Sequence, residues 1–404
     1  MSSSKSNSKA PLITVLIIFL VLAALTAISV LLFGLKIPGV NLGIKPLNDP
    51  KAEYNERVSA ANLDREAARE NTELIENYNE EVVEIENYNN SLLEEHRPEA
   101  SSTGWDLVDV SGFGVQNKVE KTVSRRDLLL GGGILVNYWH AVPEDMPTDE
   151  LKSIQVDLNN TKDKGETKWQ VGSEGASIKV YPVVLNALDA MLQAAEDDGI
   201  TDYIVDQAWR SNEAQQEYWD KEAQKSKYGK LMGEELRSAI NKTVSYPGTS
   251  EYQSGFAVCL LRYKKGEKDF NATFAGTEHS DWLLKNSWKY GFIFRFPITG
   301  YPTDDTIDKS WITGRNSQMS VYRYVGKANA AIMNMNGWCM EEYYQYLKDH
   351  PHLELYENGV LKYEVVRYQD DGMNSVNVQF NGACKGNPEV TVDNLGGIIV
   401  GMCY

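Results

Sequence analysis

The side chains that could carry chemistry gather in one stretch, residues 245–259, which reads S-Y-P-G-T-S-E-Y-Q-S-G-F-A-V-C. Pro247 and Gly248 predict a turn, and the apolar run of residues 255–258 predicts a short buried strand after it. The stretch offers hydroxyl groups, phenols and the thiol of Cys259. A thiolate can bind zinc, but a zinc site needs at least three protein ligands, so Cys259 alone does not make one.

Three other short blocks accompany this stretch along the chain. They are A-W-R-S-N-E-A-Q at residues 208–215, N-S-W-K-Y-G-F-I-F-R-F-P at 286–297 and Y-R-Y-V-G at 322–326. In order and spacing the four blocks resemble those of the VanY-type D-alanyl-D-alanine carboxypeptidases, which read roughly G-Y-R-S-x-x-x-Q, P-G-x-S-E-H-Q-x-G-x-A-x-D, N-A-x-x-x-G-F-x-x-R-Y-P and E-P-W-H-x-R-Y-V-G. The resemblance extends over about residues 128–347. It implies an α+β fold of the D-Ala-D-Ala carboxypeptidase and hedgehog type, in which helices pack on a small antiparallel sheet and a cleft crosses the sheet.

The resemblance also implies a catalytic zinc ion held by two histidines and an aspartate, with a glutamate as general base on the zinc-bound water. The three ligand positions here hold Tyr252, Cys259 and Val321, and the base position holds Gln318. A phenol with a pKa near 10 is a poor ligand, valine has no donor atom, and an amide cannot accept a proton at neutral pH. We therefore predict no catalytic residue and no metal ligand at these positions, and no zinc cofactor.

The same expectation follows without an alignment, from where ionisable residues are missing. Residues 309–340 contain no His, Asp or Glu, and residues 245–266 contain no His or Asp. The five histidines of the chain are His96, His140, His279, His350 and His352. His279 lies at a predicted helix start, where we expect it to be exposed. The alternative is that His279, Cys259 and a third residue rebuild a zinc site.

The residues that would face a substrate match the family pattern more closely. Arg210 lies in W-R-S where the family has Y-R-S, and a guanidinium group suits the terminal carboxylate of a peptide, which it binds through two charge-assisted hydrogen bonds. Ser211, Gln215 and Ser250 match as well. Alternatively, these four residues serve only as internal hydrogen-bond partners of the fold. The other matching residues look structural: Gly291, Phe292, Arg295, Pro297, Arg323, Tyr324 and Gly326.

The composition excludes one class of partner. The formal net charge of −17 over 404 residues argues against nucleic acid, because phosphate binding needs a basic surface. Four cysteines are too few for a disulfide framework, although Cys384 and Cys403 could pair.

Residues 12–33 are almost wholly apolar and carry no charge. A helix of about 21 residues spans about 31 Å, close to the roughly 30 Å of a bilayer core. The segment therefore predicts a single-pass transmembrane helix after a cytoplasmic tail, residues 1–11; a cleaved signal peptide is the alternative. Lysines flank the segment on both sides and do not decide its orientation. The resemblance to wall peptidases places the main domain outside a bacterial cell membrane.

Two stretches separate this segment from the predicted domain. Residues 34–50 are punctuated by glycine and proline and predict a linker. Residues 51–98 are mostly acidic, with apolar residues near a helical period, and predict a long solvated helix that acts as a stalk. A coiled coil through which two copies self-associate is the alternative. Residues 99–127 contain serine and glycine and predict a second linker.

The VanY-like domain is expected over residues 128–350. Apolar spacing predicts a core helix over 180–197, a strand over 203–205 that leads to Arg210, and further helices over 212–241 and 327–348. Residues 351–404 lie outside the family pattern and predict a small β-rich extension with strands over Tyr363–Tyr368, Val376–Phe380 and Ile398–Met402.

Three functions are compatible with these features. The first is a membrane-anchored pseudoenzyme that binds a peptidoglycan stem peptide or an envelope protein without cutting it. The second is an active metallo-carboxypeptidase with a rearranged site, and the third is a structural scaffold of an envelope assembly with an unused cleft. The loss of four catalytic positions beside a retained Arg210 favours the first, and the scaffold comes next.

Overall fold

The computed structural model describes residues 15–24, 71–73, 77, 80, 83, 97–161, 169–263, 274–315 and 318–404. The chain divides into two compact units, Met1–Glu95 and His96–Tyr404. In the first unit, residues 15–24 are helical, and so are the described residues of the predicted stalk between 71 and 83. Among all described residues, no helix is long and apolar enough to cross a membrane. The rest of the predicted tail, transmembrane segment, first linker and stalk lies outside the described residues.

The second unit is a mixed α+β fold built on two five-stranded sheets. The first sheet has the order β4-β6-β7-β9-β8, in which β4 is parallel to β6 and the other neighbours are antiparallel. Its strands are β4 (Gln170–Val171), β6 (Tyr203–Gln207), β7 (Ala257–Arg262), β9 (Val321–Tyr324) and β8 (Phe292–Phe294). The strand predicted after the turn at residue 248 is β7, and its apolar sequence is buried along five of its six residues.

A tight turn delivers the chain into β7. The 3-10 helix η4 (Glu251–Ser254) ends at Gly255, whose φ of 76° lies in the left-handed region that favours glycine. A Cβ atom at this position would lie 2.6 Å from the ring of Tyr181. Any other residue would therefore strain the backbone and push Tyr181 away.

Helices pack around this sheet. The predicted core helix is α5 (Pro182–Asp197), which begins with proline in the first turn and buries Val184, Leu188, Met191 and Leu192. The helix predicted over residues 212–241 is instead two helices, α6 (Asn212–Ala223) and α7 (Gly233–Asn241). The last predicted helix is also divided, into α10 (Lys327–Asn336) and α11 (Met340–Asp349), because Gly337 adopts a left-handed φ of 63°. The other α-helices in the described part of this unit are α3 (Arg125–Leu129), α4 (Ile154–Thr161), α8 (Glu278–Asn286) and α9 (Ser310–Thr313).

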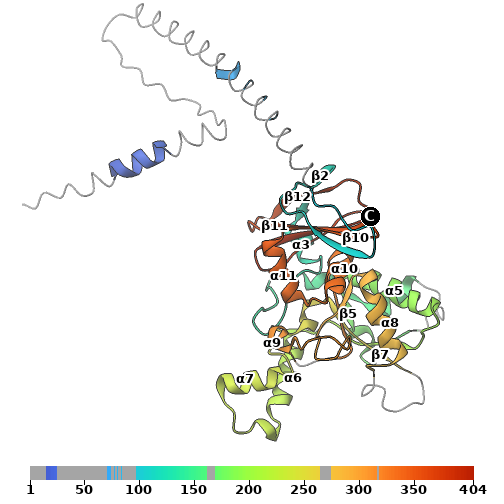
Figure 1. Ribbon diagram of the computed structural model, residues 1–404. Coiled ribbons are helices and arrows are strands. Elements are labelled where there is room, and N and C mark those ends of the chain that lie inside the picture. Colours follow the sequence, from blue (N-terminus) through green and yellow to red (C-terminus); the bar gives the residue numbers. More distant parts are fainter. Residues whose placement is uncertain are drawn as a thin grey trace, which may run out of the picture. The chain divides into compact units, whose positions relative to one another are not determined.

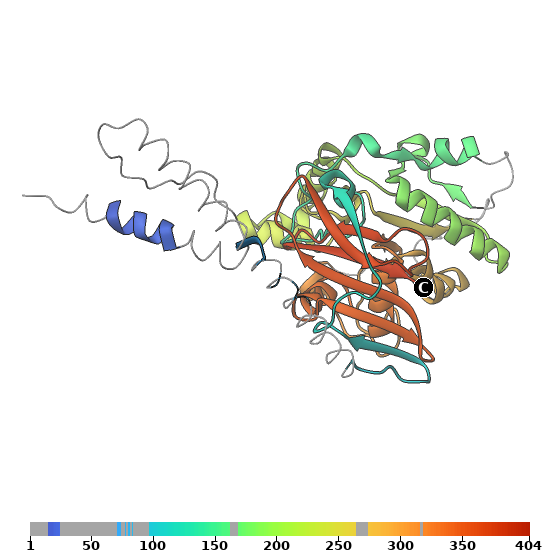
Figure 2. The same ribbon diagram turned by 90° about the horizontal axis from the view of Figure 1, so that it is seen from above.

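The second sheet joins the two ends of this unit, with the antiparallel order β1-β10-β11-β14-β13. Figure 2 shows its orange and red C-terminal strands side by side. The strands are β1 (Trp105–Asp109), β10 (His352–Glu357), β11 (Val360–Gln369), β14 (Gly397–Cys403) and β13 (Glu389–Val392). A separate pair joins β2 (Lys118–Ser124) to β12 (Ser375–Asn381), and a short pair joins β3 (Lys152–Ser153) to β5 (Lys179–Val180).

Residues 99–127 are therefore not simply a linker, because β1 and β2 lie within them and pair with C-terminal strands. Residues 351–404 contain the three predicted strands within β11, β12 and β14, together with β10 and β13, which the sequence did not predict. Val378, Ile398 and Val400 belong to the same hydrophobic core as Leu128 and Tyr324. The C-terminal strands are thus packed into the domain rather than appended to it.

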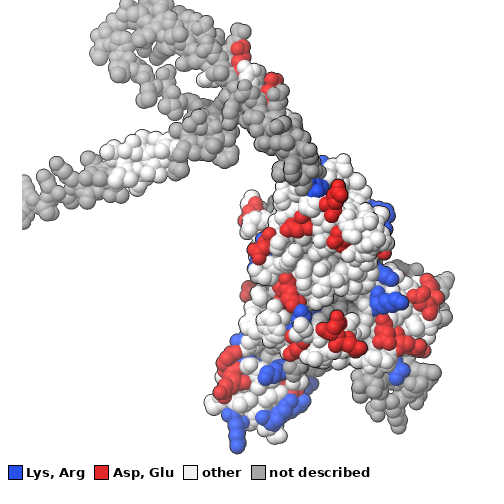
Figure 3. Space-filling view, in the orientation of Figure 1, with Lys and Arg blue, Asp and Glu red and all other residues white. Residues whose placement is uncertain are grey.

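Figure 1 shows these strands at one end of the unit and α6 and α7 at the other. Acidic and basic side chains are interspersed on the face seen in Figure 3, including the part over α6 and α7. All four cysteines are free thiols, so Cys384 and Cys403 are unpaired.

Candidate functional site

Strand pairing brings together the positions that the resemblance assigns to metal ligands. Cys259 on β7 lies directly opposite Val321 on β9 in the antiparallel register. Tyr252 belongs to η4, just before β7, and its phenol interacts with the Cys259 thiol. Tyr252 and Gln318 line the same cavity. The sequence positions predicted as a degenerate metal site therefore converge in space.

The side chains at these positions do not fit a zinc ion. Tyr252 is buried, and burial raises the pKa of its phenol well above the ordinary value. Burial likewise raises the pKa of the Cys259 thiol to about 11, and its Sγ lies 3.3 Å from Ser320 Oγ. Val321 offers no ligand atom. Zinc would face two protonated groups and a hydrocarbon, whereas it requires deprotonated sulfur, oxygen or nitrogen ligands.

His279 does not repair this deficit. It is buried rather than exposed, which corrects the prediction made from its place near a helix start. Its Nε2 lies 2.5 Å from the carbonyl oxygen of Thr201, and its ring packs edge-on against Tyr203. The capped start of α8 was correctly expected, but the ring turns inward because Tyr203 and Thr201 provide a buried surface beside it.

Over the described part of the chain, one group of three His, Cys, Asp or Glu side chains has ligand atoms close enough to share a metal ion. It consists of His352, Glu354 and Glu364, on β10 and β11. These groups already bind one another and their neighbours: His352 Nε2 lies 2.8 Å from Glu364, and Arg97 pairs with Glu354 at 2.5 Å. His352 Nδ1 lies 2.9 Å from the Phe113 carbonyl oxygen. We therefore interpret this group as an ion-pair network of the second sheet.

A cavity of about 200 Å³ lies beside the converged positions. Arg210, which follows β6, lines it together with residues from α6, η4 and the segment before β9. The lining residues are Gln207, Arg210, Gln215, Tyr218, Thr243, Val244, Ser245, Ser250, Glu251, Tyr252, Phe296, Arg315 and Gln318. Three of the four predicted ligand-binding residues, Arg210, Gln215 and Ser250, thus meet at one cavity.

Arg210 is held in this cavity by neutral groups. Its Nη1 donates to Gln215 Oε1 at 2.8 Å and its Nη2 donates to Gln207 Oε1 at 2.6 Å. The guanidinium carbon lies 4.0 Å from the ring centre of Tyr218 and 5.0 Å from that of Tyr252. Burial lowers the pKa of Arg210, and none of the carboxylates in the described residues forms an ion pair with it. The cation is positioned but not neutralised.

The other predicted residues have mixed roles. Gln215 is fully buried, and its Nε2 donates to the Ser245 carbonyl at 2.7 Å, which orients its Oε1 toward Arg210. Ser250 begins η4 and faces the cavity. Ser211 caps α6 by accepting from Ala214 N at 3.2 Å, and it lines a neighbouring cavity that Arg210 also lines.

Comparison with known proteins shows which family a part of this chain resembles. A family model described as VanY, D-alanyl-D-alanine carboxypeptidase, matches residues 177–311. A D-alanyl-D-alanine carboxypeptidase of Enterococcus faecium is 24% identical over 288 residues, which is 70% of this chain and 79% of that protein. Another, from Enterococcus faecalis, is 33% identical over 173 residues, which is 42% of this chain and 56% of that protein. This chain contains a VanY-like domain.

A solved structure supports the fold of the VanY-type domain. The vancomycin-resistance D,D-dipeptidase VanXYg, in complex with a D-Ala-D-Ala phosphinate analogue, matches with a TM-score of 0.50 at 19% identity, over 71% of this chain and 99% of that chain. The family-model match ends at residue 311, before Gln318 and Val321. The departures at these two positions therefore lie beyond the part of the chain that the family model recognises.

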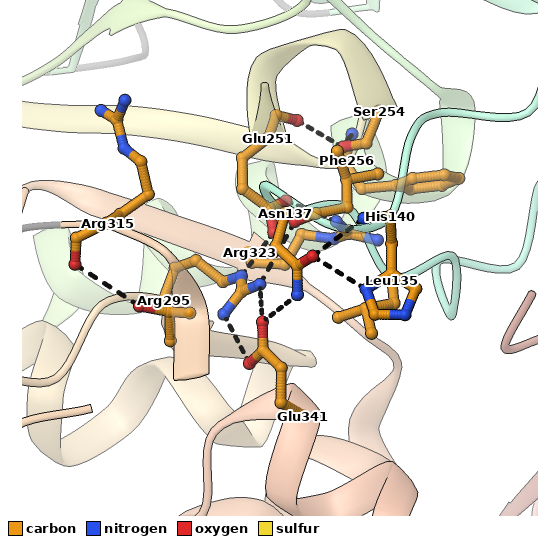
Figure 4. A network of polar contacts seen from close by, with 12 residues as sticks. Leu135, Asn137, His140, Glu251, Ser254, Phe256, Arg295, Arg315, Arg323 and Glu341 are labelled. Carbon is orange, nitrogen blue, oxygen red and sulfur yellow. Dashed lines mark hydrogen bonds and ion pairs between the residues drawn. The ribbon is translucent and has the colours of Figure 1, made fainter. Parts of the chain in front are cut away.

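A buried ionic network adjoins the cavity through Glu251 (Figure 4). Glu251 pairs with Arg295 and, at 2.5 Å, with Arg323, and Arg295 also pairs with Glu341 at 2.7 Å. Asn137 donates to Glu341 at 2.9 Å. Both arginines are fully buried, as expected for residues judged structural from the sequence. Glu251 lines the cavity, but its two carboxylate oxygens pair with Arg295 and Arg323 and not with Arg210.

Sequence reasoning missed Gln207, Tyr218 and Arg315 in this site. Gln207 ends β6, and Tyr218 lies on the face of α6 that turns toward Arg210. Residues 309–340 were interpreted only by their lack of His, Asp and Glu, a criterion that does not detect Arg315.

The high pKa of Cys259 predicts a slow thiol. Only the thiolate is alkylated, and a pKa of about 11 leaves about 200-fold less thiolate at pH 8 than an ordinary cysteine has. We expect a variant whose other cysteines are replaced by serine to react with iodoacetamide at least about 200-fold more slowly than a free cysteine, with a rate that rises about tenfold per pH unit up to pH 11. A matched variant that keeps only the half-buried Cys384 serves as control. Fast labelling of folded protein at pH 8 would show that Cys259 is a thiolate and an available zinc ligand.

Proposed function

We propose that this protein binds the carboxylate end of a peptidoglycan stem peptide and does not cleave it. The observation that carries the proposal is Arg210: a positioned, half-buried guanidinium group that faces a cavity and has only neutral partners among the described residues. A carboxylate would complete its coordination through two parallel hydrogen bonds. The names of the relatives, D-alanyl-D-alanine carboxypeptidases, suggest a peptide that ends in D-alanine.

Loss of cleavage follows from the side chains beside Arg210. Hydrolysis of a peptide by a metallo-carboxypeptidase needs a metal-bound water and a base that takes its proton. Val321 and Gln318 can supply neither function, and the buried Tyr252 and Cys259 keep their protons at neutral pH. These groups can hold a peptide end but cannot activate water.

The place of the protein in the cell is part of the same proposal. We propose that residues 12–33 anchor the chain in a bacterial cell membrane with the VanY-type domain on the outer side, where stem peptides are found. An envelope protein with an exposed carboxyl terminus could present the same chemical group.

Titration of a pentapeptide that ends in D-Ala-D-Ala tests the proposal by calorimetry. We expect the wild-type domain to bind the peptide, and Arg210→Gln to weaken binding by roughly 30- to 5,000-fold, because truncating one partner of a buried charge pair costs about 2–5 kcal/mol. The C-terminal amide of the peptide should bind as weakly to the wild type. Arg237→Gln is the matched control, because Arg237 also stacks on a tyrosine, 4.1 Å from the ring centre of Tyr246, but does not line the cavity.

Two results would contradict the proposal. Release of D-alanine by the purified domain in the presence of zinc would restore the active carboxypeptidase with a rearranged site. Absence of binding to the wild type would favour a scaffold whose cavity is unused.

A further inference from the structure

We propose that Arg315 is a second ligand-binding arginine, so that the cavity is a two-arginine site for a carboxylate in which a guanidinium supplies the positive charge that a metal supplies elsewhere in the family. That the ligand is a peptide rests on the proposed function. That the ligand is an anion does not, because it follows from the two arginines.

Arg315 occupies the same cavity as Arg210. It follows Gly314, whose left-handed φ of 72° ends α9 and turns the chain inward. Figure 4 shows its guanidinium group pointing away from Arg295 and Glu341, two members of the buried ionic network. Its ring neighbour is Phe296, with 5.9 Å between the guanidinium carbon and the ring centre.

The hydrogen bonds of Arg315 leave its charge unmatched. Nη1 donates to the Asn241 carbonyl at 3.2 Å and to Ser245 Oγ at 3.0 Å, both neutral acceptors. The buried Nε has no hydrogen-bond partner. Among the residues that the structure describes, none forms an ion pair with Arg315, although only 7% of it is exposed.

Such an arrangement costs free energy in the absence of a ligand. A buried charge without a counter-ion is expensive, and two like charges in one cavity add to the cost. Burial, and to a smaller extent the charge of Arg210, lower the pKa of Arg315 to about 10, which still leaves it charged at neutral pH. Glu251 attracts the charge of Arg315 from a distance, but its carboxylate forms its ion pairs with Arg295 and Arg323. The counter-ion of Arg315 is therefore an anion that enters the cavity from solution.

The cavity defines what kind of anion fits. The phenol of Tyr252 interacts electrostatically with both Arg210 and Arg315, and all three residues line the cavity. Tyr252 occupies the position that the resemblance assigns to the first metal ligand, so Arg315 brings a positive charge to the cavity that adjoins this position. A volume of about 200 Å³ equals roughly six or seven water molecules, which admits a chain end or a small acid but no folded domain. Hydroxyl and amide groups of Thr243, Ser250 and Gln318 can bind the peptide group that precedes the carboxylate.

Three variants and two probes test this inference. The probes are the D-Ala-D-Ala pentapeptide, measured by its Kd, and sodium acetate, measured by the rise in Tm relative to sodium chloride at the same ionic strength. We expect Arg315→Gln and Arg315→Met to weaken peptide binding at least tenfold and to abolish the acetate-dependent rise in Tm. Arg237→Gln should behave as the wild type in both measurements.

A stability measurement separates a binding role from a structural one. Without ligand, Arg315→Met should unfold at the same Tm as the wild type or above it, because the substitution removes an unmatched buried charge. A Tm well below that of the wild type would show that Arg315 holds the fold together and would overturn the inference.

The outcomes for the two proposals differ. If Arg210→Gln weakens peptide binding and Arg315→Gln does not, the proposed function is supported and the role of Arg315 as a second ligand-binding arginine is contradicted. If the peptide does not bind but acetate stabilises the wild type and not the Arg315 variants, the two-arginine site stands and its natural ligand is another carboxylate.

Discussion

Glu251→Gln is expected to lower the free energy of unfolding of the VanY-type domain by about 3–5 kcal/mol. The carboxylate of Glu251 binds two fully buried arginines, and its removal leaves Arg323 with backbone carbonyl groups as its only partners among the described residues. Breaking one side of a buried ion pair is costly because the remaining charge stays in a medium that solvates it poorly. Since domains of this kind are stable by about 5–15 kcal/mol, the loss is a large part of the total.

Urea denaturation followed by circular dichroism measures this effect. Glu217→Gln, on the exposed face of α6, is the matched control and should change the free energy by less than about 0.5 kcal/mol. Adding Arg323→Met to Glu251→Gln should recover part of the loss, because it removes the charge left unmatched. A loss of less than about 1 kcal/mol for Glu251→Gln alone would mean that the network contributes little to the fold.

Restoring the family's ligand types is expected to create a zinc site. The variant that combines Tyr252→His, Cys259→Asp, Gln318→Glu and Val321→His should bind one zinc ion per chain with a Kd below about 1 μM, at least about 100-fold tighter than the wild type. The reason is geometric: residues directly opposite in an antiparallel pair have Cβ atoms about 4.5–5.5 Å apart, and position 252 contacts position 259. Arg315→Gln should strengthen binding further by removing a nearby positive charge.

Elemental analysis after gel filtration measures the zinc content, and circular dichroism confirms that each variant is folded. The same variant with Val321 retained is the control, because it lacks one of the three ligands and should hold zinc weakly. A folded variant that retained no stoichiometric zinc would show that positions 252, 259 and 321 do not converge as strand pairing places them.

The sequence predicted those elements around the site that depend only on residues adjacent in the chain. The turn at Pro247 and Gly248 and the apolar run after it are read from adjacent residues, and they became η4 and β7. The spacing of apolar residues in α5 is likewise a property of one helix. The lack of a donor atom at Val321 required no structure, because a side chain without a ligand atom cannot bind metal in any conformation.

Other features depended on contacts between distant residues. The sequence predicted a linker over 99–127, but β1 and β2 pair with strands more than two hundred residues later, and no local pattern specifies such a partner. His279 was predicted to be exposed from its helix position and is buried, because the packing of Tyr203 decides its environment.

The amino-acid sequence thus determined that Tyr252, Cys259, Gln318 and Val321 occupy the positions that the resemblance assigns to the metal ligands and the base. Only the tertiary structure decided which charges meet in the cavity. Glu251 is matched by two arginines, while Arg210 and Arg315 share one cavity without a counter-ion in the described residues. Charge neutralisation depends on distances of a few ångströms between residues far apart in the chain, and the chain order alone does not contain them.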